Sequence, residues 1–196
     1  RAGNPFGYCD QGIDTTITIY VNPTPILSVT VADTIVCDSS TLDITVNDLL
    51  GNVEGVKVYQ LTTTDASGNV TGVQPTGEYA AGTNITDDLV NLTNEVQQIS
   101  YNFKARIFDD RAGNPFGYCD QGIDTTITIY VNPTPILSVS VADTIVCDSS
   151  TLDITVNDLL GNVEGVKVYQ LTTTDASGNV TGVQPTGEYA AGTNIT

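Results

Sequence analysis

The sequence contains no histidine, methionine or tryptophan, and it has few basic residues. Without histidine, mechanisms that need an imidazole base, a serine–histidine pair or an imidazole zinc ligand are excluded. No run of apolar residues approaches the length of about 18 that a membrane-spanning helix needs. The chain carries 23 acidic and 6 basic residues, a formal net charge of −17. Because such a charge repels nucleic acid and anionic lipid, we expect neither nucleic-acid binding nor membrane insertion.

The residues that are present form a long repeat. Residues 1–86 recur as residues 111–196, and Thr30 against Ser140 is the one difference. The resulting period of 110 residues is too long for a helical solenoid repeat and suits one independently folding domain. Prolines in the segment 21–25 deny ladder hydrogen bonds and stiffen the chain, so we place the junctions before Pro23 and Pro133. The sequence thus predicts the end of one repeat in 1–22, a complete repeat in 23–132 and the first part of another in 133–196.

Alternating apolar and polar residues predict strands in the complete repeat. The expected strands cover 26–31, 41–46, 56–61, 99–107 and 126–131, with a weaker strand region over 70–79. Residues 86–92 are the one helical candidate, because Thr86 suits an N-cap and two aspartates follow it. Six or seven strands per period predict an all-β fold made of tandem Ig-like antiparallel β-sandwich domains.

Each period holds two cysteines, which are Cys37 and Cys119 in the complete repeat. A disulfide between these two would tie the start of the domain to its end and contribute on the order of 4 kcal/mol in the chain-entropy model. The alternative pairs Cys9 with Cys37 and Cys119 with Cys147, which would join neighbouring domains across the proline segment. Buried free thiols are the third alternative. We expect the bond between Cys37 and Cys119.

The loop that precedes the last strand is rich in carboxylates. Asp109, Asp110 and Asp120 are the candidate calcium ligands there, but Arg111 competes for the same carboxylates. The spacing also matches no EF-hand loop, so we expect no cofactor and keep calcium as an alternative. Two carboxylates that lie close together by chance can resemble a glycosidase site. The sequence has no tryptophan on which a sugar ring could stack, however. We therefore expect no catalytic residues and no enzymatic activity.

Several stretches resemble the PKD-like repeats of giant surface proteins in Bacteroidota, of the SprB gliding-adhesin kind. The stretches that carry this resemblance are Thr76–Asn94, Gln98–Tyr101, Cys37–Ser40 and Thr128–Pro135. The resemblance implies an Ig-like sandwich, type 9 secretion and an extracellular position at the cell surface. Proteins of that phylum carry O-glycans at short Asp-Thr or Asp-Ser motifs, which implies glycosylation at four threonines. These candidates are Thr15, Thr34, Thr125 and Thr144.

The repeat and the resemblance together predict a long adhesin or stalk filament that gives reach and multivalent attachment. Its expected partners are neighbouring repeats of the same chain and, through the parent protein, external surfaces or polysaccharides. Two alternatives are an array of weak carbohydrate-binding modules and a set of spacer domains in a secreted hydrolase.

Overall fold

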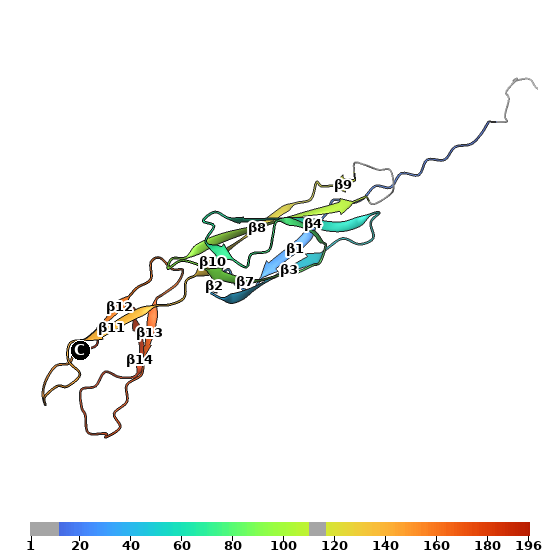
Figure 1. The fold of residues 1–196 in the computed structure, drawn as a ribbon. Helices are drawn as coiled ribbons and strands as arrows, with labels where there is room; N and C mark the ends of the chain where they lie inside the picture. Colours follow the sequence, from blue (N-terminus) through green and yellow to red (C-terminus); the bar gives the residue numbers. More distant parts are fainter. Residues whose placement is uncertain (1–11, 110–116) are drawn as a thin grey trace, which may run out of the picture.

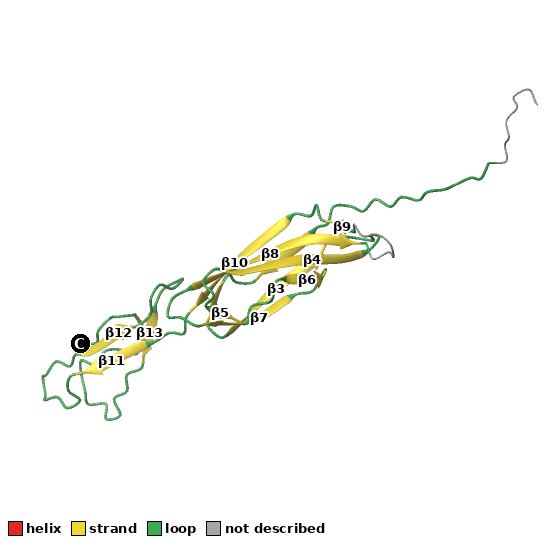
Figure 2. Cartoon of the chain, turned by 45° about the horizontal axis from the view of Figure 1, so that its top comes forward, coloured by secondary structure: helices red, strands yellow, loops and turns green. Residues whose placement is uncertain are grey.

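The structure, a computed structural model, describes residues 12–109 and 117–196. Residues 23–132, the first unit, form a two-sheet β-sandwich, and residues 133–196, the second unit, form a smaller set of strands beyond one end of it (Figure 1). Residues 12–22 extend away from the opposite end of the first unit. Strands and loops are the only elements in the described part of the chain (Figure 2). The described residues accordingly include no helix suited to crossing a membrane.

The smaller sheet of the first unit has four antiparallel strands in the order β1-β3-β7-β5. These strands are β1 (Leu27–Val31), β3 (Ser40–Asp48), β7 (Ile85–Asn91) and β5 (Val70–Thr71). β3 shows why this sequence forms a strand that is buried on one face. Leu42, Ile44 and Val46 alternate with exposed polar residues and point into the sandwich, as the period of two in a strand requires.

The larger sheet has the strand order β2-β10-β8-β4-β6, with β9 paired to the end of β8. Its strands are β2 (Ile35–Cys37), β10 (Asp124–Asn132), β8 (Gln97–Phe108), β4 (Val56–Asp65), β6 (Gly77–Ala80) and β9 (Tyr118–Cys119). β2 and β10 run parallel, whereas the other pairs are antiparallel. Every second side chain of β8 from Ile99 to Ile107 is buried. The expected fold class, an all-β Ig-like sandwich, is confirmed.

The core lies between the two sheets. Its largest side chains are Tyr59, Tyr101 and Phe103, and the Tyr59 and Phe103 ring centroids are 5.6 Å apart. Burying such aromatic and aliphatic side chains supplies most of the free energy that favours folding. The sandwich is therefore complete within the first unit.

The helix expected at residues 86–92 is wrong, because this segment belongs to strand β7. Ile85, Asp87, Leu89 and Asn91 alternate on the buried face of β7. Two of these inward residues are polar, and each is bonded to other core groups. That pattern concealed the period of two, while the adjacent aspartates imitated the first turn of a helix. The short strands β2 and β9 were not expected either.

The second unit keeps only part of this architecture. Its strands are β11 (Leu137–Val141), β12 (Ile154–Asp158), β13 (Val168–Leu171) and β14 (Gly187–Ala190). β11 pairs with β12 and β13 with β14, in the same registers as β1 with β3 and β4 with β6. The second unit thus repeats those strand pairs whose two members both fall within residues 133–196.

Candidate partner-binding site

The free edge of β13 is the main feature that distinguishes the second unit. In the first unit, β4 pairs with β6 on one side and with ten residues of β8 on the other. β13 has the sequence of the middle of β4 and pairs only with β14 among the described residues. Its other edge presents backbone N–H and C=O groups that have no ladder partner there. By the 110-residue period, the counterpart of β8, which covers this edge in the first unit, falls outside residues 133–196.

The missing neighbours also shorten the strands. β3 spans nine residues, and its first five pair with β7. β12, its copy, spans five and keeps only a single bridge, from Ile154 to Ile195, on that side. Residues 145–147 repeat β2 but are not a strand. Because β2 is held by its parallel pairing with β10, the copy has no edge on which to form.

Apolar side chains that are buried in the first unit are uncovered in the second. Val58 is 8% exposed and its copy Val168 is 51% exposed. Leu42 is 2% exposed, whereas Leu152 is 37% exposed. Only Val156 and Tyr169 are buried among the described hydrophobic residues of this unit. By the 110-residue period, the counterparts of β8 and β10 fall outside residues 133–196, so these side chains have no covering strand here.

Two cavities open between the strand pairs of the second unit. One has a volume of about 570 Å³ and lies beside the junction, where Ile136, Val166 and Tyr169 contribute to its wall. The other has a volume of about 590 Å³, and its wall includes Leu152, Ile154 and Leu171. In the first unit, Leu42, Ile44 and Leu61, the copies of these three residues, pack in one core cluster with side chains of β8 and β10. The second cavity therefore lies where that cluster has no counterpart of β8 and β10.

The charge of the second unit favours a basic occupant. Residues 133–196 include seven Asp or Glu residues and a single basic residue, Lys167. β8, which fills the equivalent space in the first unit, carries Lys104 and Arg106 on its outward positions. Arg106 donates a hydrogen bond of 3.1 Å to Oε1 of Gln60, and the copy of Gln60, Gln170, lines the first cavity. A strand with the β8 pattern would thus bring two basic residues to this acidic unit.

The expected disulfide between Cys37 and Cys119 is wrong, because both thiols are free. Cys37 pairs with Asn132 at one end of the larger sheet, and Cys119 pairs with Ile107 at the other. The intervening length of β8 spans roughly 33 Å at about 3.3 Å per residue, whereas bridged Cα atoms lie within about 7 Å. Cys147 is also free, and Cys9 lies outside the described residues.

The candidate calcium ligands are only partly described. Asp109 donates its backbone N–H to the carbonyl of Gly117 at 2.6 Å, and Asp120 accepts a hydrogen bond from Gln121. Asp110 lies outside the described residues. Among the residues that are described, no three Asp, Glu, Cys or His side chains gather as a metal site. Calcium binding stays a prediction.

The four glycosylation candidates differ in accessibility. Thr15, Thr34 and Thr144 are exposed, whereas Thr125 is half-buried in β10 beside Phe103 of β8. Glycosylation at these positions stays a prediction.

Comparisons with known proteins find similar folds but no family. No family model matches the chain, and no curated protein matches it. A crystal structure of the class 5 fimbrial chaperone CfaA is 11% identical, with a TM-score of 0.34, over 86% of this chain and 82% of that one. A chaperone–tip adhesin complex of CFA/I fimbriae biogenesis gives 11% identity and a TM-score of 0.35, over 86% and 81% of the two chains.

The expected membership of the PKD-like repeats of gliding adhesins is therefore wrong, because no family model and no curated protein matches the chain. The functions that depended on it are corrected as well, namely the adhesin or stalk filament, the carbohydrate-binding array and the spacer domains. Gliding motility and type 9 secretion were inferred only from that resemblance, so these two expectations are corrected with it. At TM-scores below 0.5, the two chaperone structures supply no functional argument of their own.

Proposed function

We propose that the chain is a non-catalytic module of Ig-like units whose second unit accepts an extended strand of the β8 pattern along β13. The observation that carries this proposal is the free edge of β13, next to an apolar face that β8 covers in the first unit. Addition of a strand to a sheet edge gains affinity from backbone hydrogen bonds and specificity from pockets for alternate side chains. The partner we propose is a segment with apolar residues at every second position and basic residues between them, as in β8.

A synthetic peptide with the sequence of residues 97–108 tests this proposal. Added to the whole chain, it should bind in a saturable one-to-one complex and shift NMR signals of residues 133–196 while leaving those of the first unit in place. The control peptide has the same composition in an order that breaks the alternation, and it should not bind. Equal binding of both peptides, or no binding at millimolar peptide, would refute strand addition.

A matched pair of variants locates the binding site. Leu171→Asp places a charge in the wall of the second cavity and should abolish peptide binding. Ala176→Asp adds the same charge in an exposed loop outside both cavities and should bind the peptide as the unaltered chain does. A dimer of the chain in the absence of peptide, seen by analytical ultracentrifugation, would contradict a separate partner and favour a second copy in the cavities.

A neighbouring unit of the same chain is a second partner that we propose. β10 ends at Asn132 and β11 starts at Leu137, which places the boundary between the two units in the segment that joins these strands. Several hydrogen bonds also join the two units. The division into 1–22, 23–132 and 133–196 forms part of this proposal. An extracellular location is also part of this proposal. It agrees with the low share of charged residues, 15%, and cell fractionation would test it.

A further inference from the structure

Two loops meet where the first unit ends and the second begins. One loop joins β7 to β8, and the other joins β12 to β13. The backbone N–H of Gly161 donates to the carbonyl of Asn94 at 2.9 Å, and the N–H of Val96 donates to the carbonyl of Asn162 at 2.7 Å. The two loops therefore exchange backbone hydrogen bonds in both directions, much as neighbouring residues of a sheet do.

The loop of the first unit is held in shape from within. Nδ2 of the buried Asn91 donates to the carbonyls of Glu95 and Val131, both at 2.8 Å. Oδ1 of the same side chain accepts the backbone N–H and the hydroxyl of Thr93, both at 2.9 Å. Because these contacts all belong to the first unit, the carbonyl of Asn94 and the N–H of Val96 are positioned before the second unit docks.

The loop of the second unit is also fixed by its own residues. Lys167 forms an ion pair with Asp158, and its Nζ donates to the carbonyls of Leu160 and Gly161 at 3.3 and 3.2 Å. The hydrogen bond from Lys167 is the main reason that the pKa of Asp158 lies below its usual value. The backbone N–H of Leu160 completes the loop by donating to Oδ1 of Asp158 at 3.0 Å.

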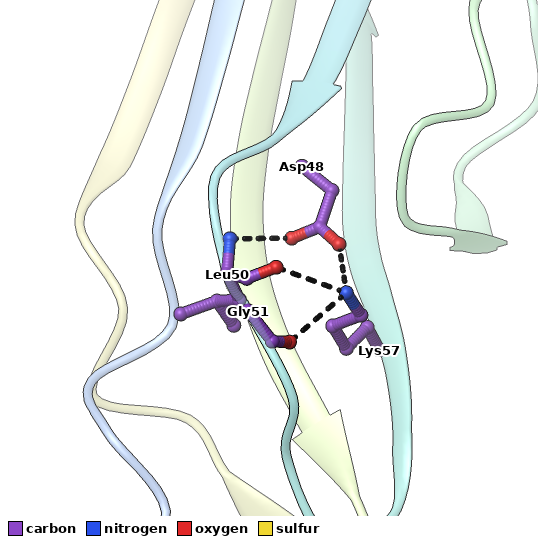
Figure 3. Close-up of polar contacts among 4 residues, drawn as sticks. All are labelled: Asp48, Leu50, Gly51 and Lys57. Atoms are coloured by element: carbon purple, nitrogen blue, oxygen red, sulfur yellow. Dashed lines mark hydrogen bonds and ion pairs between the residues drawn. The ribbon is translucent and has the colours of Figure 1, made fainter.

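The same loop exists in the first unit, where it exchanges no backbone hydrogen bonds with a loop of another unit among the described residues. Figure 3 shows Lys57 bridging Asp48 and the carbonyls of Leu50 and Gly51, with the N–H of Leu50 bonded to Asp48. These four residues are the copies of Asp158, Leu160, Gly161 and Lys167. Since the lysine makes the same contacts with the aspartate and the two carbonyls in both copies, docking is not what creates the shape of the loop.

The proline segment adds a third attachment. The hydroxyl of Thr134, between Pro133 and Pro135, donates to a carboxylate oxygen of Asp38 in the first unit. At the other end of the segment, Asn132 and Glu164 exchange two hydrogen bonds of 2.9 and 2.8 Å. The segment is therefore bonded to both units, and the orientation between them does not depend on proline stiffness alone.

We propose that the loop Asn94–Val96 and the loop Gly161–Asn162 form a preformed stacking interface that fixes the orientation of consecutive units. The inference rests on the proposal that neighbouring units are partners, and it is independent of strand binding. Its specificity depends on a close approach. A Cβ atom at Gly161 would lie 2.5 Å from Cγ of Glu95, whereas a Cβ atom at the copy, Gly51, would meet nothing within 4 Å.

The two glycines make a matched pair of variants. Gly161→Ala should push Glu95 out of place and separate the loops, while Gly51→Ala should leave the junction intact. The measurement is ¹⁵N relaxation of the whole chain without added peptide. The unaltered chain and Gly51→Ala should show one rotational diffusion tensor for both units, and Gly161→Ala should show two. Exchange of the Val96 amide with solvent should also become at least tenfold faster in Gly161→Ala.

A double variant separates loss of stacking from loss of folding. Glu95→Ala removes the atoms that a Cβ at position 161 would meet, so Glu95→Ala/Gly161→Ala should restore a single tensor and the slow exchange of Val96. A second unit that merely unfolds in Gly161→Ala would not be rescued in this way, and that result would overturn the interface. Independent tumbling of the two units in the unaltered chain would overturn it as well. Binding of the β8 peptide is measured on the unaltered chain, so its outcome is separate from that of the Gly161→Ala series.

Discussion

The hydroxyl of Tyr101 donates a hydrogen bond of 2.6 Å to Oδ2 of Asp87 in the core of the first unit. The same carboxylate oxygen accepts the backbone N–H of Gln74 at 2.8 Å, and Asp87 is only 2% exposed. Burial, together with the Asp87 carboxylate, raises the pKa of the Tyr101 hydroxyl well above its usual range. The hydroxyl therefore stays protonated and joins the two facing sheets through β7 and β8.

Removal of this carboxylate should weaken the first unit strongly. Asp87→Ala leaves the buried Tyr101 hydroxyl and the half-buried N–H of Gln74 without an acceptor, and such groups cost about 1–3 kcal/mol each when buried and unpaired. We expect urea denaturation to show a loss of about 2–4 kcal/mol. The adjacent Asp88 is exposed and accepts one hydrogen bond, from Thr41, so Asp88→Ala should cost less than about 1 kcal/mol. Similar losses for the two variants would contradict a structural role for the buried carboxylate.

A second pair of glycines tests how completely β7 covers the first unit. Gly72 has φ of 82°, and a Cβ there would lie 1.9 Å from the carbonyl oxygen of Asp88 in β7. Gly72→Ala should therefore destabilise the first unit by more than about 2 kcal/mol. Gly182, its copy, has φ of 76° but no neighbour within 4 Å. Gly182→Ala should therefore destabilise the second unit only through the left-handed backbone conformation at residue 182, by about 1 kcal/mol. Denaturation curves that shift equally would show that β7 yields to the added methyl group.

The thiols should react without unfolding of the protein. Cys37 and Cys147 are exposed and Cys119 is half-buried, and all three are free. We expect a thiol reagent to modify Cys37 and Cys147 rapidly in the native chain and Cys119 more slowly. Peptide mapping without reductant should find Cys37 and Cys119 unlinked, and reductant should not change the urea midpoint. A peptide that joins Cys37 to Cys119 would restore the disulfide rejected above.

Alternation in the sequence was sufficient to predict the strands whose inward residues are all apolar. β3 and β8 are of this kind, and Leu42 and Tyr101 lie buried as their patterns indicate. β7 was not predicted, because the polar residues Asp87 and Asn91 occupy its inward positions. Their burial depends on partners such as Tyr101 and Val131, which come from other strands. Local periodicity contains no information about such partners.

The open edge of β13 follows from the repeat pattern and not from a local signal. Residues 133–196 repeat residues 23–86 almost without change, so no local signal distinguishes β13 from the middle of β4. The difference lies in the absence of a neighbouring strand along β13 among the described residues. The cysteine pairing failed similarly. Positions early and late in a domain suggest proximity, but strand direction places Cys37 and Cys119 at opposite ends of one sheet.

The turn after β4 should make the first unit sensitive to acid through Asp65. Burial acts to raise the pKa of Asp65, but hydrogen bonds from the backbone of Val70, Ser67 and Gly68 and from the Ser67 hydroxyl outweigh it and lower the pKa below 3.8. A carboxylate whose pKa is lower in the folded state stabilises the fold above its unfolded pKa, and this contribution is lost as pH falls through the folded pKa. Asp65→Ala should thus cost about 1–2 kcal/mol at pH 7. Urea midpoints measured between pH 7 and pH 2 should show a constant difference from the unaltered chain down to about pH 4 and a shrinking one below it. A difference that does not change with pH would mean that the ionised form of Asp65 does not stabilise the turn.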